Sequence, residues 1–178
     1  MGAEQISGKA WVFGDNIDTD AIYPGQFLHI QNEPEMAQHA FEFIRPEFVK
    51  AVRPNDIIIA GKNFGCGSSR EQAVLCLKQN GIAAVVAHSY ARIFYRNAIN
   101  CALPVLTFES MEQDMNGALQ TINSGDEVKL EFTGNVLEVT SSGKSYNLQP
   151  LPAHLFEIVS HGGLIEHLKK RMEAEKSK

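Results

Sequence analysis

A polar, glycine-rich segment at residues 61–71, GKNFGCGSSRE, holds the residue types best suited to chemistry in this chain. Ser68 and Ser69 offer hydroxyl groups, and Arg70 offers a planar guanidinium that can hold a carboxylate through two hydrogen bonds. The segment follows an apolar run at 56–60 and precedes a helical pattern, so we expect it at the carboxyl end of a strand, where open α/β sheets bind ligands. The first turn of a helix also presents free N–H groups and the positive end of its dipole. The pattern indicates a site for an anion, with a carboxylate well suited to it.

Other interpretations of the same residues remain open. Ser69 could cap the following helix and Arg70 could face solvent, which would make the segment an ordinary turn. Two phosphate-binding motifs are excluded, because no Lys-Ser/Thr pair follows the last glycine and the glycine spacing does not fit G-x-G-x-x-G.

The elements that would position this segment alternate between strands and helices. Strands are expected at 9–13, 56–60, 82–87 and 104–108, and helices at 32–43, 69–80, 89–100 and 110–122. This alternation predicts a largely parallel sheet with right-handed crossovers. Alternating runs at 127–132, 136–140 and 145–149 predict an antiparallel β meander, and a closing helix is expected at 164–174. The class is α/β, with one domain at 1–178 and its core at about 9–170.

Composition narrows the function classes. The chain has 178 residues, a formal net charge of −5 and 44% hydrophobic residues. No apolar run reaches the roughly 20 residues that span a bilayer, and the first residues do not resemble a secretory signal. The acidic balance argues against a nucleic-acid-binding protein. We therefore expect a cytoplasmic protein with no membrane or nucleic-acid partner.

The three cysteines, Cys66, Cys76 and Cys101, are odd in number and form no C-x-x-C pair. A disulfide framework or a zinc ribbon is therefore not expected, and reduced thiols are the default. Cys76 lies in an expected helix, where a small buried side chain is typical. Cys66 is expected to be exposed and oxidisable, without a catalytic role.

Three segments together resemble the swivelling C-terminal domain of the aconitase superfamily. Residues 61–71 match its G-x-x-[FY]-G-x-G-S-S-R-E signature, and residues 14–20 (GDNIDTD) and 89–97 (SYARIFYRN) fit the same family. The resemblance covers about residues 9–170, and the length is similar to that of the separate small subunits found in isopropylmalate isomerases and homoaconitases. It implies a layered β/β/α swivel domain.

The resemblance also implies roles for individual residues. In that family a serine of the G-S-S-R motif removes the proton next to a substrate carboxylate, and by motif position this catalytic serine is Ser68. A serine needs an electropositive, water-poor site to act as a base. Ser69 and Arg70 match the family's substrate-carboxylate ligands. Asp20 matches an aspartate at the edge of the active site and is the second expected catalytic residue, although the aspartates of this motif could instead form Asx turns.

The implied reaction is that of a hydro-lyase, which isomerises its substrate by dehydration and rehydration with the help of a [4Fe–4S] cluster. In the family the cluster cysteines belong to a large subunit. We therefore expect that this chain binds no metal or cofactor itself and is active only with the large subunit, as a heterodimer or heterotetramer. Arg92 and Arg96 share a helix face and could support the serine loop, form the subunit interface or simply face solvent.

The family recognises the variable part of its substrate with the segment at 22–30. Here the segment carries Phe27, Leu28, His29 and Ile30 as expected substrate-binding residues, and no arginine. Because a buried carboxylate without a partner is costly, an apolar substituent is favoured over a third carboxylate. A neutral His29 would flank an apolar pocket and a charged one could pair with a carboxylate, or the residue could contact nothing.

The expected function is therefore the interconversion of 2- and 3-isopropylmalate, which are small dicarboxylates, in leucine biosynthesis. The alternatives are the dehydration of 2,3-dimethylmalate or methylmalate (citramalate) and a homoaconitase. A non-catalytic relative that binds carboxylates or RNA represents a different class, which the acidic balance disfavours in the case of RNA.

Overall fold

Seven strands form one mixed sheet in the computed structural model, which describes residues 5–110 and 114–176. The strands are β1 Gln5–Val12, β2 Ile57–Ala60, β3 Ala84–Ala87, β4 Val105–Thr107, β5 Glu127–Glu131, β6 Val136–Val139 and β7 Lys144–Asn147. Their order is β4-β3-β2-β1-β5-β6-β7. Strands β1 to β4 are parallel and β5 to β7 are antiparallel, with β1 pairing to both β2 and β5. The expected parallel sheet and C-terminal meander are both present, joined through β1.

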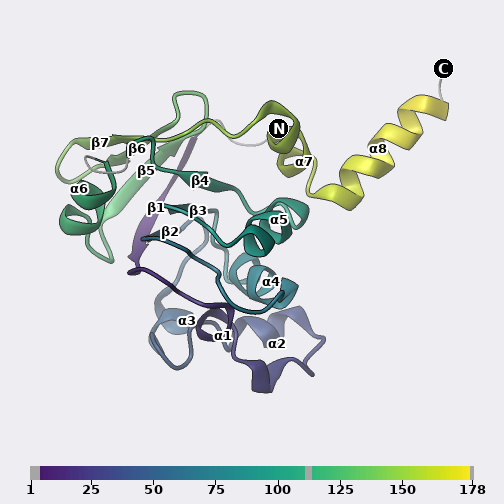
Figure 1. Ribbon diagram of the computed structural model, residues 1–178, viewed down its shortest axis with the longest axis horizontal. Helices are drawn as coiled ribbons and strands as arrows, with labels where there is room; N and C mark the ends of the chain where they lie inside the picture. Colours follow the sequence, from purple (N-terminus) through teal and green to yellow (C-terminus); the bar gives the residue numbers. More distant parts are fainter. Residues whose placement is uncertain (1–4, 111–113, 177–178) are drawn as a thin grey trace.

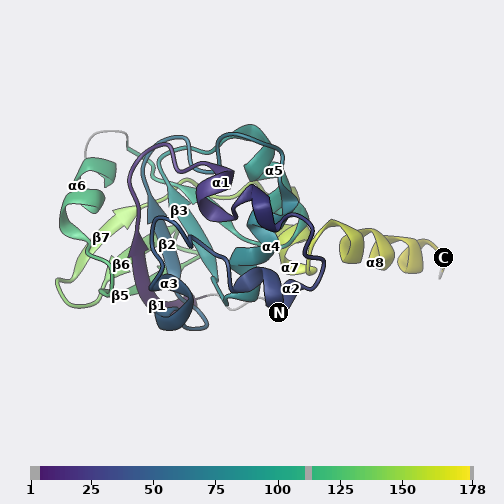
Figure 2. The ribbon, with the colours of Figure 1, turned by 90° about the horizontal axis from the view of Figure 1, so that it is seen from below.

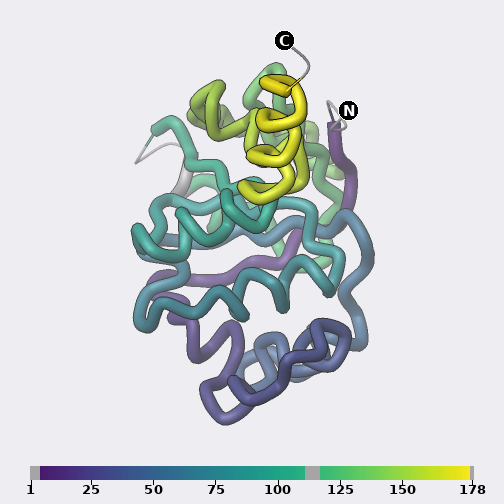
Figure 3. The backbone as a smooth tube through the Cα atoms, turned by 90° about the vertical axis from the view of Figure 1, so that its right-hand side faces the viewer, coloured from purple at the N-terminus to yellow at the C-terminus, as the bar shows by residue number. Residues whose placement is uncertain are grey.

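The helices gather mainly on one side of the sheet. They are α1 Thr19–Ile22, α2 Glu33–Ala37, α3 Phe48–Ala51, α4 Glu71–Gln79, α5 Arg92–Asn100, α6 Asp114–Thr121, α7 Ala153–Ser160 and α8 Leu164–Lys176, with a short 3-10 turn at Gly25–Phe27. Helices α4 and α5 lie side by side on the helical face (Figure 3). Helix α6 lies at the opposite end of the molecule, beside the meander, and α8 extends away from the body (Figure 1). Among the described residues, no helix is long and apolar enough to cross a membrane.

Alternating side chains of the parallel strands build two hydrophobic clusters. Ile58 of β2 faces the helical side, whereas Ile57 and Ile59 face the meander, and all three are fully buried. Apolar runs without polar alternation are typical of such doubly covered strands. Figure 2 shows the resulting layers, with the meander and α6 on one side of β1–β3 and the main helices on the other.

The meander covers the face of the parallel strands opposite the main helices, because the sheet curls back on itself. An isolated antiparallel bridge joins Phe108, just after β4, to Leu148, just after β7. The amide of Glu109 donates to the carbonyl of Asn147 at 2.9 Å, so the two ends of the sheet are hydrogen-bonded to each other. This closure produces the β/β/α layering.

The expected helix at 32–43 is wrong over its second half. Helix α2 ends at Ala37, and Phe43, at the end of the expected helix, is 63% exposed. The reason is Phe41, which adopts a positive φ of 53° and is fully buried. Its ring stacks on Phe13 at 4.3 Å between ring centroids, a contact that a continuous helix would not provide.

Other boundaries also differ from expectation. Strand β1 begins at Gln5, four residues early, because it pairs with β5. The short helices α1 and α3 and helix α7 were not expected. Helix α8 is present, but its Ile165 and Leu168 are exposed and not packed on the core. The start of the expected helix at 110–122 falls partly on 111–113, outside the described residues.

Candidate functional site

The serine loop, residues 61–70, connects β2 to α4 at the carboxyl end of the parallel strands, as expected. Its path is held by Gly65, which has a φ of 75°, where a side chain is strained. A Cβ atom on Gly65 would also lie 2.1 Å from Cγ of Phe94 on α5. The glycine therefore lets the loop cross closely over α5.

The other two motif segments of the sequence meet the serine loop through backbone contacts. The amide of Gly65 donates to the carbonyl of Ile17 at 2.7 Å, and the amide of Thr19 donates to the carbonyl of Cys66 at 2.8 Å. On the other side, the amide of Ala91 donates to the carbonyl of Phe64 at 3.0 Å. The loop is thus fixed between the segments at 14–20 and 89–97.

Ser68 is positioned by its backbone, and over residues 5–110 and 114–176 its hydroxyl group has no hydrogen-bond partner. Its carbonyl accepts hydrogen bonds from the hydroxyl of Thr19 at 3.1 Å and from the amide of Arg70 at 2.9 Å. The side chains of Ser68 and Ser69 are exposed. Helix α4 begins at Glu71, later than expected, with Arg70 as its N-cap and no side-chain capping bond, so the structure does not support a capping role for Ser69.

Arg70 pairs with Asp20 of α1. Its Nη1 atom hydrogen-bonds to Oδ1 of Asp20 and, at 3.3 Å, to the carbonyl of Tyr23. The same carboxylate oxygen accepts from the amide of Gly25 at 2.7 Å. The hydrogen bond from Arg70 is the main reason that the pKa of Asp20 lies below its usual value, followed by the bond from Gly25. Asp20 is therefore ionised at neutral pH and holds the guanidinium beside the serines.

The remaining aspartates of the segment shape the chain locally. Asp18 caps α1, because its Oδ1 accepts from the amide of Ala21 at 2.6 Å. Asp15 accepts from the amide of Lys62 at 2.7 Å and so ties this segment to the serine loop. Asp18 thus has a local capping role, Asp15 makes a long-range contact with the serine loop, and Asp20 contacts Arg70.

Arg92 and Arg96 lie on the other side of the serine loop. Both are exposed, and together with Gly67, Ala91 and Ile93 they line an open hollow of about 480 Å³. They share the first two turns of α5, as their spacing predicted. The loop is therefore flanked by cationic side chains on two sides, which favours a negatively charged partner.

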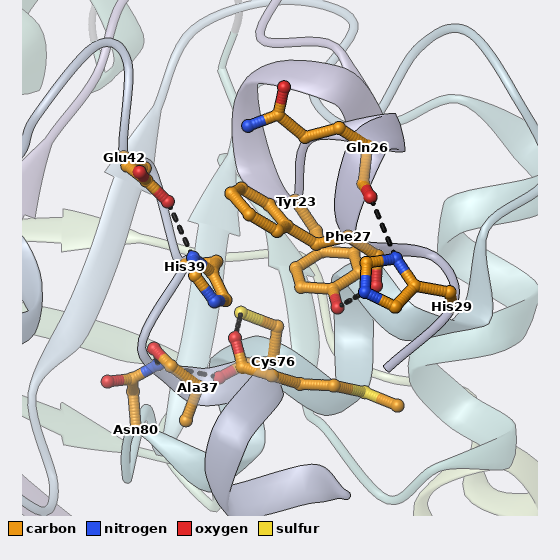
Figure 4. Close-up of polar contacts among 10 residues, drawn as sticks. Tyr23, Gln26, Phe27, His29, Ala37, His39, Glu42, Cys76 and Asn80 are labelled. Carbon is orange, nitrogen blue, oxygen red and sulfur yellow. Dashed lines mark hydrogen bonds and ion pairs between the residues drawn. The ribbon is translucent and has the colours of Figure 1, made fainter. Parts of the chain in front are cut away.

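The segment at 25–30 forms a compact turn whose inward side chains hold its shape (Figure 4). Phe27 stacks on the imidazole of His39, with ring centroids 3.6 Å apart. Nδ1 of His39 contacts Oε2 of Glu42 at 2.6 Å, and the hydroxyl of Tyr23 donates to the carbonyl of Phe27 at 2.7 Å. Phe27 is thus an anchor of the turn.

Leu28 and His29 are the outward residues of the same turn. Leu28 is 39% exposed and His29 is exposed, whereas Ile30 is buried in the core. Nδ1 of His29 lies 2.9 Å from the carbonyl of Gln26. Because a carbonyl only accepts, Nδ1 carries the proton, and Nε2 is an acceptor when the ring is neutral.

Thr19 and His39 are positioning residues that were not singled out from the sequence. Thr19 lies inside the D-T-D motif, 2% exposed, and its hydroxyl bonds the serine loop, so motif membership was the available signal. No sequence motif pointed to His39, because its stacking on Phe27 depends on how the segment after α2 turns back.

The pKa values of all three thiols lie above the usual value, and Cys66, which was expected to be exposed, is half-buried. Burial raises the pKa of Cys76 to about 12, and burial with the nearby charge of Glu71 raises that of Cys101 to about 12. Burial, aided by Asp18, also raises the pKa of Cys66, the thiol nearest the serines. Cys76 is buried in α4, as expected. Over residues 5–110 and 114–176, the one group of His, Cys, Asp or Glu close enough to share a metal ion contains no cysteine.

The family model "Aconitase C-terminal domain" matches residues 5–111, which include the serine loop and both segments that hold it. The chain belongs to the aconitase family. The sequence resemblance to the aconitase swivelling domain is thereby confirmed.

Relatives of this aconitase-family chain match it along almost its whole length. A 3-isopropylmalate dehydratase small subunit of Thermodesulfovibrio yellowstonii is 48% identical and covers 96% of this chain and 98% of its own. A methanogen homoaconitase small subunit of Methanothermobacter thermautotrophicus is 44% identical, and the match covers 94% of this chain and 93% of that protein. The crystal structure of 3-isopropylmalate dehydratase from Methanocaldococcus jannaschii superposes with a TM-score of 0.89 at 40% identity, covering 97% of this chain and 98% of that one. The expected α/β aconitase-type fold is confirmed.

Proposed function

We propose that this chain is the small subunit of a cytoplasmic 3-isopropylmalate dehydratase, a hydro-lyase that interconverts 2- and 3-isopropylmalate together with a large subunit. The observation that carries the proposal is the arrangement of Ser68, Ser69 and Arg70 at the start of α4, with Asp20 holding Arg70. Relatives that are named 3-isopropylmalate dehydratase small subunit match nearly the whole of this chain at 45–49% identity, which supports the proposal.

The exposure of the serines explains why a second chain is required. A serine hydroxyl becomes a useful base only where positive charge lowers its pKa and water is excluded. Arg70 and the N-terminus of α4 supply positive electrostatic potential, but Ser68 itself is exposed. A large subunit that docks over the loop, against the hollow lined by Arg92 and Arg96, would exclude water and complete the site.

The two serines, Arg70 and Asp20 take different parts in the proposed reaction. Ser68 accepts the proton from the carbon next to a substrate carboxylate and returns it during rehydration, while Ser69 and Arg70 hold that carboxylate. Asp20 keeps the guanidinium of Arg70 in place through its ion pair. The [4Fe–4S] cluster belongs to the large subunit and supplies the Lewis acid for loss and re-addition of the hydroxyl group.

Leu28 and His29 suit the isopropyl group of the substrate. With Gln26, they are the exposed side chains of the turn at 25–30, and no arginine stands there to pair with a third carboxylate. Leu28 offers apolar surface, and a neutral His29 has no charge with which to pair a third carboxylate. Homoaconitase is the second candidate, because one homoaconitase small subunit is 44% identical to this chain and a protonated His29 could pair with a carboxylate.

Substrate turnover by the complex reconstituted with the large subunit tests the proposal. We expect the highest kcat/KM with 3-isopropylmalate, roughly 10-fold or more above citramalate and 2,3-dimethylmalate, because each methyl or methylene group buried in a pocket contributes a factor of about 10 to 200. Preference for a tricarboxylate would instead indicate a homoaconitase. Absence of turnover with every substrate, together with an RNA gel shift, would indicate the non-catalytic class.

Replacing His29 with arginine should shift the preference of the complex toward tricarboxylates. The guanidinium would pair with a third carboxylate and would be left unpaired against an isopropyl group, which is costly in a closed site. We expect the ratio of kcat/KM for homoisocitrate over 3-isopropylmalate to rise at least about 10-fold. His154→Arg, at an exposed position of α7, is the matched control. An unchanged ratio would mean that the turn does not contact the variable group.

A further inference from the structure

A histidine pair closes the corner between α7 and α8, far from the serine loop in the sequence. Nδ1 of His161 and Nδ1 of His167 are 2.9 Å apart, and the rings are stacked with centroids 5.1 Å apart. A carboxylate oxygen of Glu157 and one ring nitrogen of each histidine all lie within 4.8 Å of one another. From this geometry we propose that Glu157, His161 and His167 form a zinc-binding site.

The spacing of the two nitrogens suits one shared ion. Two imidazole nitrogens that each lie about 2.0–2.1 Å from zinc stand roughly 3 Å from each other. The observed 2.9 Å separation therefore needs little adjustment. Glu157 is exposed, so its side chain is free to move the remaining distance, and a water molecule would complete a four-coordinate shell.

The backbone holds the ligands in place before any ion binds. Glu157 lies on α7 and His161 is the C-cap residue of this helix, four positions later, whose amide donates to the carbonyl of Glu157 at 3.0 Å. The amide of His167 donates to the carbonyl of Gly163 at 2.9 Å. Gly163 has a φ of 109°, and a Cβ there would lie 2.4 Å from the carbonyl oxygen of Asn100, so the corner is fixed against the end of α5.

Burial makes the pair a better metal site than a chance surface contact. His167 is 8% exposed, and its Nδ1 faces the other imidazole. Two imidazoles with one carboxylate match the donor preference of zinc and similar transition metals, whereas magnesium and calcium prefer oxygen ligands. Such an ion would join the end of α7 to the first turn of α8 and set the direction in which α8 extends from the body (Figure 1).

Calorimetric titration of the untagged, metal-free full chain with zinc chloride tests this site without substrate or partner, so its outcome is independent of the proposed function. We expect one zinc per chain with micromolar or tighter affinity and a rise of several degrees in melting temperature. Glu157→Gln and His161→Gln should each weaken binding at least about 10-fold. Because His161 is only partly buried, its variant is expected to fold, which circular dichroism would verify.

His154→Gln, an exposed histidine on the same helix, is the control and should bind zinc as the unmodified chain does. Cobalt in place of zinc adds a direct readout, because its visible absorption reports nitrogen and oxygen ligands and should be lost in His161→Gln. A chain that binds no zinc would overturn the proposal. Equal binding by the unmodified chain and His161→Gln would overturn it as well, since a simple N–H···N hydrogen bond would then account for the pair.

Discussion

Replacing Ser68 with alanine is expected to lower kcat of the reconstituted enzyme about 1,000-fold, with KM changed little. Loss of a general base typically costs about 10² to 10⁴ in rate. The variant should fold and assemble normally, because the side chain is exposed and the loop is held through the carbonyl of Ser68, which alanine retains. Steady-state kinetics in both directions would measure the effect, since the same base serves dehydration and rehydration.

Ser145→Ala is the matched control for this experiment, because Ser145 is also exposed but lies on β7, in the meander. It should retain full activity. Co-elution of each variant with the large subunit in size-exclusion chromatography separates loss of chemistry from loss of assembly. Turnover near the normal rate in Ser68→Ala would remove this serine from the mechanism.

Replacing Arg70 with glutamine is expected to lower kcat/KM roughly 100- to 1,000-fold. The side chain would lose the charge and the fork that hold the substrate carboxylate, and charge-assisted hydrogen bonds are among the strongest in proteins. Asp20 would lose its partner as well. Its pKa should rise toward the usual value, because the hydrogen bond from Arg70 is the largest cause of the present lowering. Kinetics and an NMR titration of the carboxyl group would measure the two effects.

Three further variants define what Arg70 contributes. Arg70→Lys keeps the charge but not the planar fork, so we expect an intermediate loss. Asp20→Asn should cost less than Arg70→Gln, because it leaves the guanidinium in the site without its anchor. Arg171→Gln, at an exposed position of α8, should have no effect. If Arg70→Gln retained normal kcat/KM, the substrate carboxylate would have to bind elsewhere.

The sequence was most informative where structure depends on near neighbours in the chain. The apolar run ending at Ala60, the glycine-rich loop and the helix at Glu71–Gln79 follow from β-branched composition, glycine and helical periodicity, which act over a few residues. The same short range explains the errors. Helix α2 ends at Ala37 because Phe41 is drawn into a cluster with Phe13 and Phe48, a contact between distant parts of the chain.

The candidate site shows the same division. The motifs pointed to Ser68, Arg70 and Asp20 as candidate site residues. Only the fold brings Asp20 and Arg70, which are fifty positions apart in the sequence, together as an ion pair. The segment at 22–30 is predicted to recognise the variable part of the substrate, but its sequence does not tell which of its side chains face outward. Stacking of Phe27 on His39 and burial of Ile30 decide that Leu28 and His29 do.

By itself, the sequence determined the class of the fold, the family resemblance and the chemical character of the serine loop, because residue types and local spacing carry this information. Tertiary structure decided how the meander closes over the sheet, which side chains of each segment are exposed, and which groups meet at Arg70 and at the α7–α8 corner. These features depend on packing and hydrogen bonds between residues far apart in the chain, for which no local pattern exists.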